Sequence, residues 1–333
     1  NALQILNDAA AHEVVRVDGA APLEESFRIL SASHAYQCVG ARDEVPPALR
    51  VHEGFLQKAP ELLVVSASGS GVDVFDLDAC TRAGVLAVNQ AGANAQSVAE
   101  HALAMMISLY RSIASADRML RAGWSGSRWD FMGTDLAAKT VGILGLGNIG
   151  TRLAQICRNG FGCHVLATDP FVSPEEIAAR GAEAVSFEDL LLGSDAISVH
   201  TPLTDLTRDL FNAEAFSKMK RGAIFVNAAR GSIHNEEALA DAIDAGHIAG
   251  AGLDVWDVEP PANTHRLLQM PNVIATPHIA GYTSDSLANM ASYAATQLLE
   301  IFSGGRPPRA VNPEVLPQFR VRYAERFGEP SWD

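Results

Sequence analysis

Arg230, Glu259 and His278 each follow a short apolar run of the sequence, and their types fit acid–base chemistry beside an anion. An arginine binds a carboxylate through two parallel hydrogen bonds. A histidine titrates near neutral pH and serves as a general acid or base. A nearby carboxylate favours the protonated imidazole and fixes its orientation. These residue types therefore suit hydride transfer to a small 2-keto acid, which needs a cation for the carboxylate and a proton donor for the nascent alkoxide.

Each of the three has a structural alternative. Arg230 could cap a strand or pair with a surface acid, Glu259 could be a solvated loop acid, and His278 could be a core histidine. The chain has 10 histidines. For three others we expect structural or indirect roles, because none follows a strand with an acid partner close in the expected topology: His101, His200 and His234. No cluster of His, Cys, Asp and Glu has metal-ligand spacing, so we expect no metal.

The second half of the sequence alternates apolar strands with helical patterns from Thr140 onward. This alternation predicts a parallel sheet whose strand ends meet at one edge. Helical patterns include 150–159, 236–245 and, after the last strand, 285–302. The expected strands are Val141–Leu144, His164–Thr168, Ala196–His200, Ala223–Asn227, Gly250–Val255 and Val273–Thr276.

A dinucleotide-binding motif links the first two of these strands. The sequence GLGNIG at residues 145–150 follows a strand and opens a helix, and Asp169 ends the next strand nineteen residues later. Gly145 permits the tight turn, Gly147 lets backbone approach a pyrophosphate, and Gly150 lets helix and strand pack closely. Asp169 should accept hydrogen bonds from ribose hydroxyls and repel a 2′-phosphate, which favours NAD over NADP.

The first 140 residues carry their own alternation, with strands expected at 13–17, 36–39, 61–66 and 85–88 and helices at 23–31 and 96–113. The sequence therefore predicts an α/β protein with two doubly wound parallel-sheet domains. We expect a flavodoxin-like substrate domain from residues 1–95 and 286–333. Residues 96–285 should form an inserted Rossmann NAD-binding domain. Its segment 111–138, with Trp124 and Trp129, is either a covering loop or an arm that dimerises.

Composition narrows the function classes. The net charge of −14 and the lack of a long basic run argue against nucleic acid and acidic membrane surfaces as partners. The longest apolar stretch, near 102–110, is too short to cross a bilayer. The 4 cysteines show no CxxC pairing and no signal peptide is evident, so we expect reduced thiols in a cytoplasmic protein.

The motifs together resemble the D-isomer-specific 2-hydroxyacid dehydrogenases over roughly residues 10–315. They occur in the family's order at 68–73 (SGSGVD), 97–101 (SVAEH), 145–150, 200–204 (HTPLT), 227–231 (NAARG), 253–260 (LDVWDVEP) and 276–281 (TPHIAG). The resemblance implies that Arg230, Glu259 and His278 are catalytic and that Asp169 binds ribose. It also implies a homodimer, a cleft that closes over substrate, and a strand before Ala2. Further contacts that it implies are Asn148 and Ile149 at the pyrophosphate, Thr201, Pro202, Ala228 and Asp254 at the nicotinamide half, and Ser68, Gly69, Ser70 and Gly71 at the substrate, together with Arg230 and His278.

Departures from the family pattern bear on cofactor and substrate. Asn148 stands where many members have arginine, which predicts somewhat weaker cofactor binding. Phosphoglycerate dehydrogenases commonly carry arginine where this chain has Ala67, and Arg42 at best replaces a second one. The HTPLT motif is nevertheless closer to the phosphoglycerate and glyoxylate branches than to D-lactate dehydrogenase. The substrate therefore stays open between an unphosphorylated 2-hydroxy acid and 3-phosphoglycerate. A third alternative is a non-enzymatic NAD(H) sensor like the family's corepressors.

Overall fold

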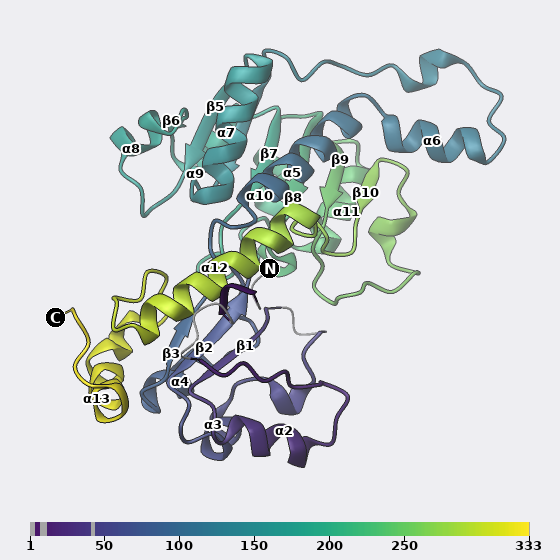
Figure 1. Cartoon of the computed structure of the whole chain (residues 1–333). Helices are drawn as coiled ribbons and strands as arrows, with labels where there is room; N and C mark the ends of the chain where they lie inside the picture. The colour runs from purple at the N-terminus through teal and green to yellow at the C-terminus, as the bar shows by residue number, and fades with distance from the viewer. Residues whose placement is uncertain (1–3, 7–11, 41–43, 333) are drawn as a thin grey trace. The chain divides into compact units, whose positions relative to one another are not determined.

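The computed structural model describes residues 4–6, 12–40 and 44–332, and the chain divides into two compact units (Figure 1). Unit 1 comprises Asn1–Asn94 with Thr283–Asp333, and unit 2 comprises Ala95–Tyr282. Each unit has its own parallel sheet, so the predicted α/β class is confirmed. Arg42 lies outside the described residues.

Unit 2 is built on a seven-stranded sheet in the order β10-β9-β8-β7-β4-β5-β6, and every neighbouring pair is parallel. The chain starts at β4 and moves outward through β5 to β6. It then returns to the other side of β4 and moves outward again to β10, so the direction reverses between β4 and β7. In open α/β sheets, ligands bind beyond the strand ends at such a reversal. The strands are β4 (Thr140–Leu144), β5 (His164–Thr168), β6 (Glu183–Ala184), β7 (Ala196–Val199), β8 (Ala223–Asn227), β9 (Ile248–Leu253) and β10 (Val273–Ala275).

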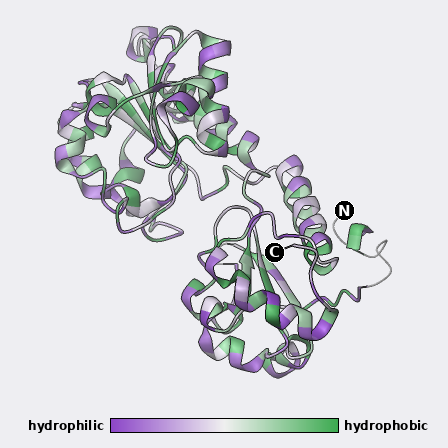
Figure 2. Ribbon diagram, turned by 90° about the vertical axis from the view of Figure 1, so that its left-hand side faces the viewer, coloured by the Kyte–Doolittle hydropathy of each residue, from purple (hydrophilic) through white to green (hydrophobic). Residues whose placement is uncertain are grey.

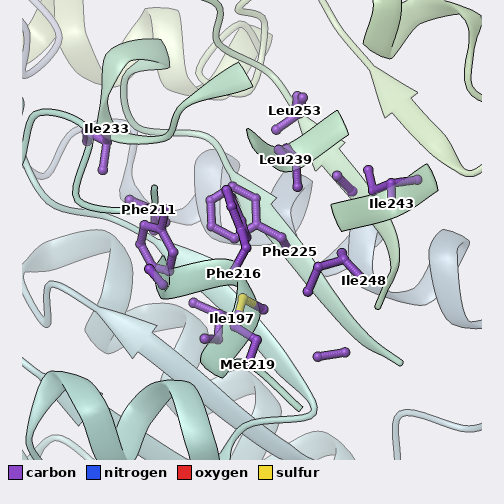
Figure 3. Packing of buried hydrophobic residues seen from close by; sticks show 14 of the residues in the cluster. Ile197, Phe211, Phe216, Met219, Phe225, Ile233, Leu239, Ile243, Ile248 and Leu253 are labelled. Atoms are coloured by element: carbon purple, nitrogen blue, oxygen red, sulfur yellow. The ribbon is translucent and has the colours of Figure 1, made fainter. Parts of the chain in front are cut away.

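Helices cover both faces of this sheet, because side chains along each strand alternate between two apolar clusters. In β8, Phe225 points to one cluster, while Ile224 and Val226 point to the other. On the first face, Phe225 lies 4.8 Å from Phe211 and 5.3 Å from Phe216 between ring centroids (Figure 3). The helices of the unit are α5 (Ala95–Tyr110), α6 (Ile113–Arg121), α7 (Asn148–Phe161), α8 (Pro174–Ala179), α9 (Phe187–Gly193), α10 (Ala213–Lys218) and α11 (Glu236–Asp244), with short 3-10 turns η2 (Arg128–Phe131), η3 (Gly231–Ile233) and η4 (Arg266–Gln269).

The segment 111–138 contains a helix that its weak periodicity did not predict. No residue of α6 is buried in the described part of the chain. Figure 1 shows α6 and the segment after it standing away from the sheet of unit 2. The segment exposes several large apolar side chains: Ile113, Met119, Leu120, Trp129 and Met132.

Unit 1 has a three-stranded parallel sheet in the order β1-β2-β3. The strand expected at 13–17 is wrong, since those residues pair with no strand in the described ranges and leave Val15 50% exposed. Apolar alternation does not make a strand without a neighbour to pair with. Helix α13 was not predicted. The elements are β1 (Ala35–Val39), β2 (Val64–Ser68), β3 (Leu86–Val88), α2 (Leu23–Leu30), α3 (Glu53–Lys58), α4 (Leu77–Arg82), α12 (Ser284–Phe302), α13 (Leu316–Phe327), η1 (Pro47–Leu49) and η5 (Pro313–Val315).

The helices of both units have one apolar side and one polar side. Helices alternate between green and purple around their circumference in Figure 2, as expected where one side faces a sheet and the other faces water. None of the helices in the described residues combines the length and the apolar character needed to cross a membrane.

Candidate active site

The side chains of His278 and Glu259 form a hydrogen-bonded pair at the carboxyl edge of the sheet in unit 2. His278 Nδ1 lies 2.8 Å from Glu259 Oε2, and the two side chains are 37% and 28% exposed. A carboxylate only accepts hydrogen bonds when it is ionised, so Nδ1 carries the hydrogen and Nε2 is left for another partner. The partial exposure of the imidazole leaves room for that partner.

The pair shifts the titration of both groups. The hydrogen bond to Glu259 raises the pKa of His278, although burial and the charge of Arg230 oppose it. Burial alone would raise the pKa of Glu259, but the hydrogen bond and charge of His278, with the backbone N–H of Trp256, lower it overall. Both shifts favour an imidazolium beside a carboxylate near neutral pH.

Arg230 lies on the loop that leaves β8, and buried polar side chains hold that loop. The side chain of Asn227 donates to the backbone carbonyl of Arg230 at 2.8 Å and accepts the backbone N–H of Ala229 at 2.9 Å. Its Nδ2 also lies 3.0 Å from Nδ1 of His234. Burial lowers the pKa of His234 to about 4, which keeps the ring neutral and able to accept that hydrogen bond. The structural role expected for His234 fits this arrangement.

Asp254 holds the turn that carries His278. Its side chain is fully buried, and its carboxylate accepts the hydroxyl of Thr276 at 2.6 Å and the backbone N–H groups of Ile279 and Ala280 at 2.8 Å each. His278 has a φ of +56°, a left-handed conformation that costs energy in residues other than glycine. The hydrogen bonds to Asp254 therefore stabilise an unfavourable backbone. The nicotinamide contact expected for Asp254 stays a prediction.

The expectation that His101 has no nearby acid was wrong. Its Nε2 lies 3.1 Å from the hydroxyl oxygen of Thr276 and 3.7 Å from Oδ1 of Asp254. His101 sits on α5, far from β9 in sequence, and α5 packs across β8, β9 and β10. His200 is different: it is partly buried, its Nε2 lies 2.8 Å from the hydroxyl of Ser198, and desolvation lowers its pKa to about 4.

The glycine motif forms a tight loop before α7. Gly145 has a φ of +88°, and a Cβ there would lie 2.8 Å from the backbone oxygen of His200. A Cβ on Gly150 would lie 2.1 Å from the carbonyl oxygen of Gly145. A Cβ on Gly147, by contrast, would meet no described atom within 4 Å, so the loop has open space in front of it. The first turn of α7, with Asn148 and Ile149, points its N–H groups toward the loop end, where an anion is favoured.

Asp169 braces this loop from the next strand. Its Oδ2 accepts the backbone N–H of Leu146 at 2.8 Å, and its Oδ1 accepts the N–H of Phe171 at 2.9 Å. It also borders an open pocket of about 880 Å³ that Thr168 and Pro170 help to line. An ionised carboxylate has further acceptor capacity, so it can still meet ribose hydroxyls. The residues present thus fit a dinucleotide.

Several expected cofactor contacts meet at the same edge. Ile149 of α7 packs against an apolar cluster of Val98, Ala228 and Ala280, which joins the dinucleotide loop to the turn after His278. Thr201 and Pro202 follow β7 after His200, beside the turn that Gly145 forms. The three catalytic candidates, Asp254 and the cofactor-binding candidates therefore all lie in one unit, 95–282.

Comparison with known proteins identifies the family to which this unit is similar. Residues 103–280 match the family model described as D-isomer specific 2-hydroxyacid dehydrogenase, NAD binding domain. The match covers more than half of the 333 residues. The chain belongs to the D-isomer specific 2-hydroxyacid dehydrogenase family.

Relatives in this dehydrogenase family differ in substrate. D-3-phosphoglycerate dehydrogenase of Archaeoglobus fulgidus is 40% identical over 88% of this chain and 56% of its own length. The crystal structure of D-lactate dehydrogenase from Aquifex aeolicus, complexed with NAD and lactic acid, has a TM-score of 0.78, 27% identity and coverage of 93% and 94%. A glyoxylate reductase from Paecilomyes thermophila has a TM-score of 0.79, 28% identity and coverage of 87% and 89%. The chain spans about half the length of the curated relatives that it matches.

The glycine loop expected to bind substrate lies in unit 1, at the carboxyl end of β2. Gly69 has a φ of +81° and its carbonyl accepts the backbone N–H of Gln90 at 2.7 Å. Asn89 donates to the carbonyl of Ser70 at 2.9 Å, and Gln37 donates to the hydroxyl of Ser68 at 3.1 Å. The substrate contacts of Ser68, Gly69, Ser70 and Gly71 stay a prediction.

The sequence did not single out every residue of the site. Thr276, Asn227 and Trp256 lay inside quoted motifs without assigned roles, and His101 was assigned only an indirect one. Membership of a motif was the available signal, because their partners lie on other strands and helices. Among the described residues, no group of three or more His, Cys, Asp and Glu could hold a metal ion.

Proposed function

We propose that this chain is the catalytic part of an NAD-dependent dehydrogenase that interconverts a small D-2-hydroxy acid and its 2-keto acid. The observation that carries the proposal is the 2.8 Å hydrogen bond between His278 Nδ1 and Glu259 Oε2, at the sheet edge that also carries the glycine loop and Arg230. A sheet edge with a dinucleotide loop and a separate acid–base pair suits hydride transfer coupled to proton transfer.

His278 is the acid–base residue of the proposed reaction. When bound at the glycine loop, NADH would supply the hydride for the carbonyl carbon of the substrate. The protonated imidazole donates its Nε2 proton to the carbonyl oxygen, so the keto group becomes a hydroxyl and His278 is left neutral. In the reverse direction, neutral Nε2 removes the hydroxyl proton. Glu259 keeps Nδ1 protonated throughout and stabilises the imidazolium that forms.

Arg230 binds the substrate carboxylate and polarises the carbonyl. Its guanidinium is close enough to influence the pKa of both Glu259 and His278. One of its nitrogens donates to the carbonyl of Ala229 at 2.7 Å, which orients the planar guanidinium. Excluding water around this contact would strengthen it.

The two units take different roles in this proposal. Unit 2 holds the cofactor: Gly145, Gly147, Asn148, Ile149 and Gly150 at the pyrophosphate, Asp169 at the ribose, and Thr201, Pro202, Ala228 and Asp254 at the nicotinamide half. Unit 1 supplies the substrate loop at 68–71. The cytoplasmic location remains a prediction.

The substrate is a D-2-hydroxy acid or its 2-keto acid, and 3-phosphoglycerate is the specific alternative. The names of several curated relatives, D-3-phosphoglycerate dehydrogenase, support the alternative. Ala67 weighs against it, because a phosphate without its arginine loses a charge-assisted hydrogen bond of roughly 1.5–3 kcal/mol. An NAD(H) sensor without turnover is less favoured, since it needs no His278–Glu259 pair.

A panel of keto acids tests the proposal. NADH oxidation is followed by absorbance with hydroxypyruvate, glyoxylate, pyruvate and 3-phosphohydroxypyruvate. Turnover of any of them supports the dehydrogenase, and the ranking of kcat/KM decides whether the substrate is phosphorylated. NADH binding without turnover of any keto acid would favour the sensor.

We also propose that the segment 111–138 is a dimerisation arm. Its support is the set of exposed apolar side chains, with Leu120 68% and Trp129 76% exposed. The variant Leu120→Asp with Trp129→Ser should shift the mass in analytical ultracentrifugation from dimer to monomer. Val321→Asp, at an exposed position of α13, is the control. A wild-type monomer at all concentrations would remove the arm proposal.

A further inference from the structure

Trp256 is a buried aromatic residue next to the catalytic candidates, and the proposed mechanism gives it no part. It follows β9 and Asp254, three residues before Glu259, and its side chain is 4% exposed. A tryptophan in this place could simply fill the core. Its contacts, however, reach the segments of all three catalytic candidates.

Two hydrogen bonds from Trp256 connect the ends of β9 and β10. Its backbone N–H donates to Glu259 Oε1 at 3.0 Å, the carboxylate oxygen that His278 does not use. Its indole N–H donates to the backbone carbonyl of Thr276 at 3.1 Å, two residues before His278. One residue therefore fixes the acid partner and also the turn that carries the imidazole.

The third contact is to the Arg230 segment. A Cβ on Gly231 would lie 2.1 Å from the carbonyl carbon and 2.2 Å from the carbonyl oxygen of Trp256. The chain after Arg230 thus packs directly on the backbone of Trp256, at a distance that only glycine permits. The loop bearing the guanidinium and the loop bearing the carboxylate share this contact.

Trp256 is itself braced from the side of α11. Its ring lies 5.4 Å from the ring of His265 with an interplanar angle of 74°. His265 Nε2 lies 3.0 Å from Glu236 Oε2, and Glu236 Oε1 accepts the backbone N–H of Asp257 at 3.0 Å. The indole therefore has little freedom to rotate away from Thr276.

We propose that Trp256 is a positioning residue that fixes the relative placement of Arg230, Glu259 and His278. Proton transfer requires the imidazole and its partners to be placed within a fraction of an ångström, and a misplacement of 1 Å costs about 10²-fold in rate. The effect on turnover rests on the proposed function, whereas the effect on the His278–Glu259 pair does not.

The test is Trp256→Phe, which removes the indole N–H and keeps an aromatic ring. The midpoint of His278 is measured by NMR titration of the imidazole, with His278→Ala to assign the signal. Glu259, Arg230 and Asp254 are the charged groups that act on this imidazole. A looser Glu259 pair should move the midpoint to lower pH. We expect kcat to fall about 10-fold, because one hydrogen bond that positions His278 is lost. KM and NADH affinity should change little.

Two controls make the result specific. Trp332→Phe makes the same chemical change in unit 1 and should move neither the midpoint nor kcat. In a Glu259→Gln background, Trp256→Phe should cause no further shift in the midpoint, because the pair through which it acts is gone. Thermal unfolding confirms that each variant is folded, and Trp256→Tyr replaces Trp256→Phe if that variant is not.

The outcomes separate the two proposals. An unchanged His278 midpoint together with normal kcat in a folded Trp256 variant overturns the positioning role. A shifted midpoint in a protein that turns over none of the keto acids keeps the positioning role and overturns the proposed function. An equal shift with and without Glu259 also overturns the positioning role, since Trp256 would then act by another route.

Discussion

Thr276 donates its hydroxyl proton to Asp254 at a separation of 2.6 Å, and this hydrogen bond joins the ends of β10 and β9. A buried carboxylate needs several donors, because an unpaired charge in the interior costs far more than a hydrogen bond returns. Asp254 obtains the others from the backbone N–H groups of Ile279 and Ala280. The turn with His278 is therefore held by an anion beneath it.

Replacing Thr276 by valine should test this support. Thr276→Val keeps the side-chain shape but removes one donor from the buried carboxylate. We expect the free energy of unfolding to fall by about 1–3 kcal/mol in chemical denaturation. The control is Thr296→Val, whose exposed hydroxyl donates to a helix carbonyl at 2.8 Å. Equal stability of the two variants would show that the hydrogen bond to Asp254 contributes no more to the free energy of unfolding than an exposed one.

His278→Ala should abolish most turnover without loss of cofactor binding. Removing a general acid lowers rates by about 10²–10⁴-fold, whereas the imidazole is not among the proposed pyrophosphate or ribose contacts. Turnover is measured from NADH oxidation by absorbance, and NADH affinity is measured by fluorescence titration. His164→Ala removes another histidine paired with an acid, at 2.9 Å from Glu183, and should be neutral. Near-normal turnover of His278→Ala would remove it as the acid.

Glu259→Gln should move the pH dependence in a defined direction. The hydrogen bond to Glu259 raises the pKa of His278. Reduction uses the protonated imidazole, so its kcat/KM falls as the pH rises through this pKa. Oxidation uses the neutral imidazole, so its kcat/KM increases over the same pH range. With glutamine, both midpoints should move to lower pH. Profiles that stay in place, as expected for the exposed control Glu183→Gln, would contradict the role of the pair.

Two glycines of the dinucleotide loop should fail in different ways when changed to alanine. Gly150→Ala brings a Cβ to 2.1 Å from the carbonyl oxygen of Gly145 and should lower the unfolding temperature. Gly147→Ala meets no described atom within 4 Å and should leave that temperature unchanged. It should instead weaken the binding of NADH, since the added Cβ projects into the space proposed for the pyrophosphate. Normal NADH affinity in Gly147→Ala would place the phosphates elsewhere.

Asp169→Ala should relax the preference for NAD. The variant loses the charge that repels a 2′-phosphate, so the ratio of kcat/KM for NADH and NADPH should approach one. Affinity for both should also fall, because Asp169 accepts the N–H of Leu146 in the glycine loop. The ratio is therefore the decisive quantity, and Asp169→Asn, which keeps an acceptor without the charge, separates the two effects. An unchanged ratio would sink the ribose assignment.

Much of unit 2 could be predicted from local patterns. Its central strands are apolar runs bounded by turns; β5 and β8 have the predicted limits, and β4, β7, β9 and β10 differ by one or two residues. The two-residue β6 has a polar first residue and no pattern of its own. The failed strand at 13–17 and the unpredicted α13 show the same limit, because partner surfaces elsewhere in the chain decide whether such segments form.

The residue types of the site and the pairing of Glu259 with His278 were predictable, but its other connections were not. Strand ends indicated that Arg230, Glu259 and His278 share an edge, and the structure pairs the last two. The link from Asp254 to Thr276 depends on the register of β9 and β10, in which Ala275 lies opposite Leu253. The contact of His101 depends on how α5 crosses the sheet. Neither relation is encoded in spacing along the chain.

The left-handed backbone of His278 has a consequence for how this protein tolerates change. At a φ of +56°, glycine or asparagine would be accommodated more easily than histidine. A selection for heat resistance alone would therefore favour replacing the residue that the proposed reaction needs. At this position, thermal stability and turnover favour different amino acids. A screen for thermal stability alone would therefore select variants without turnover.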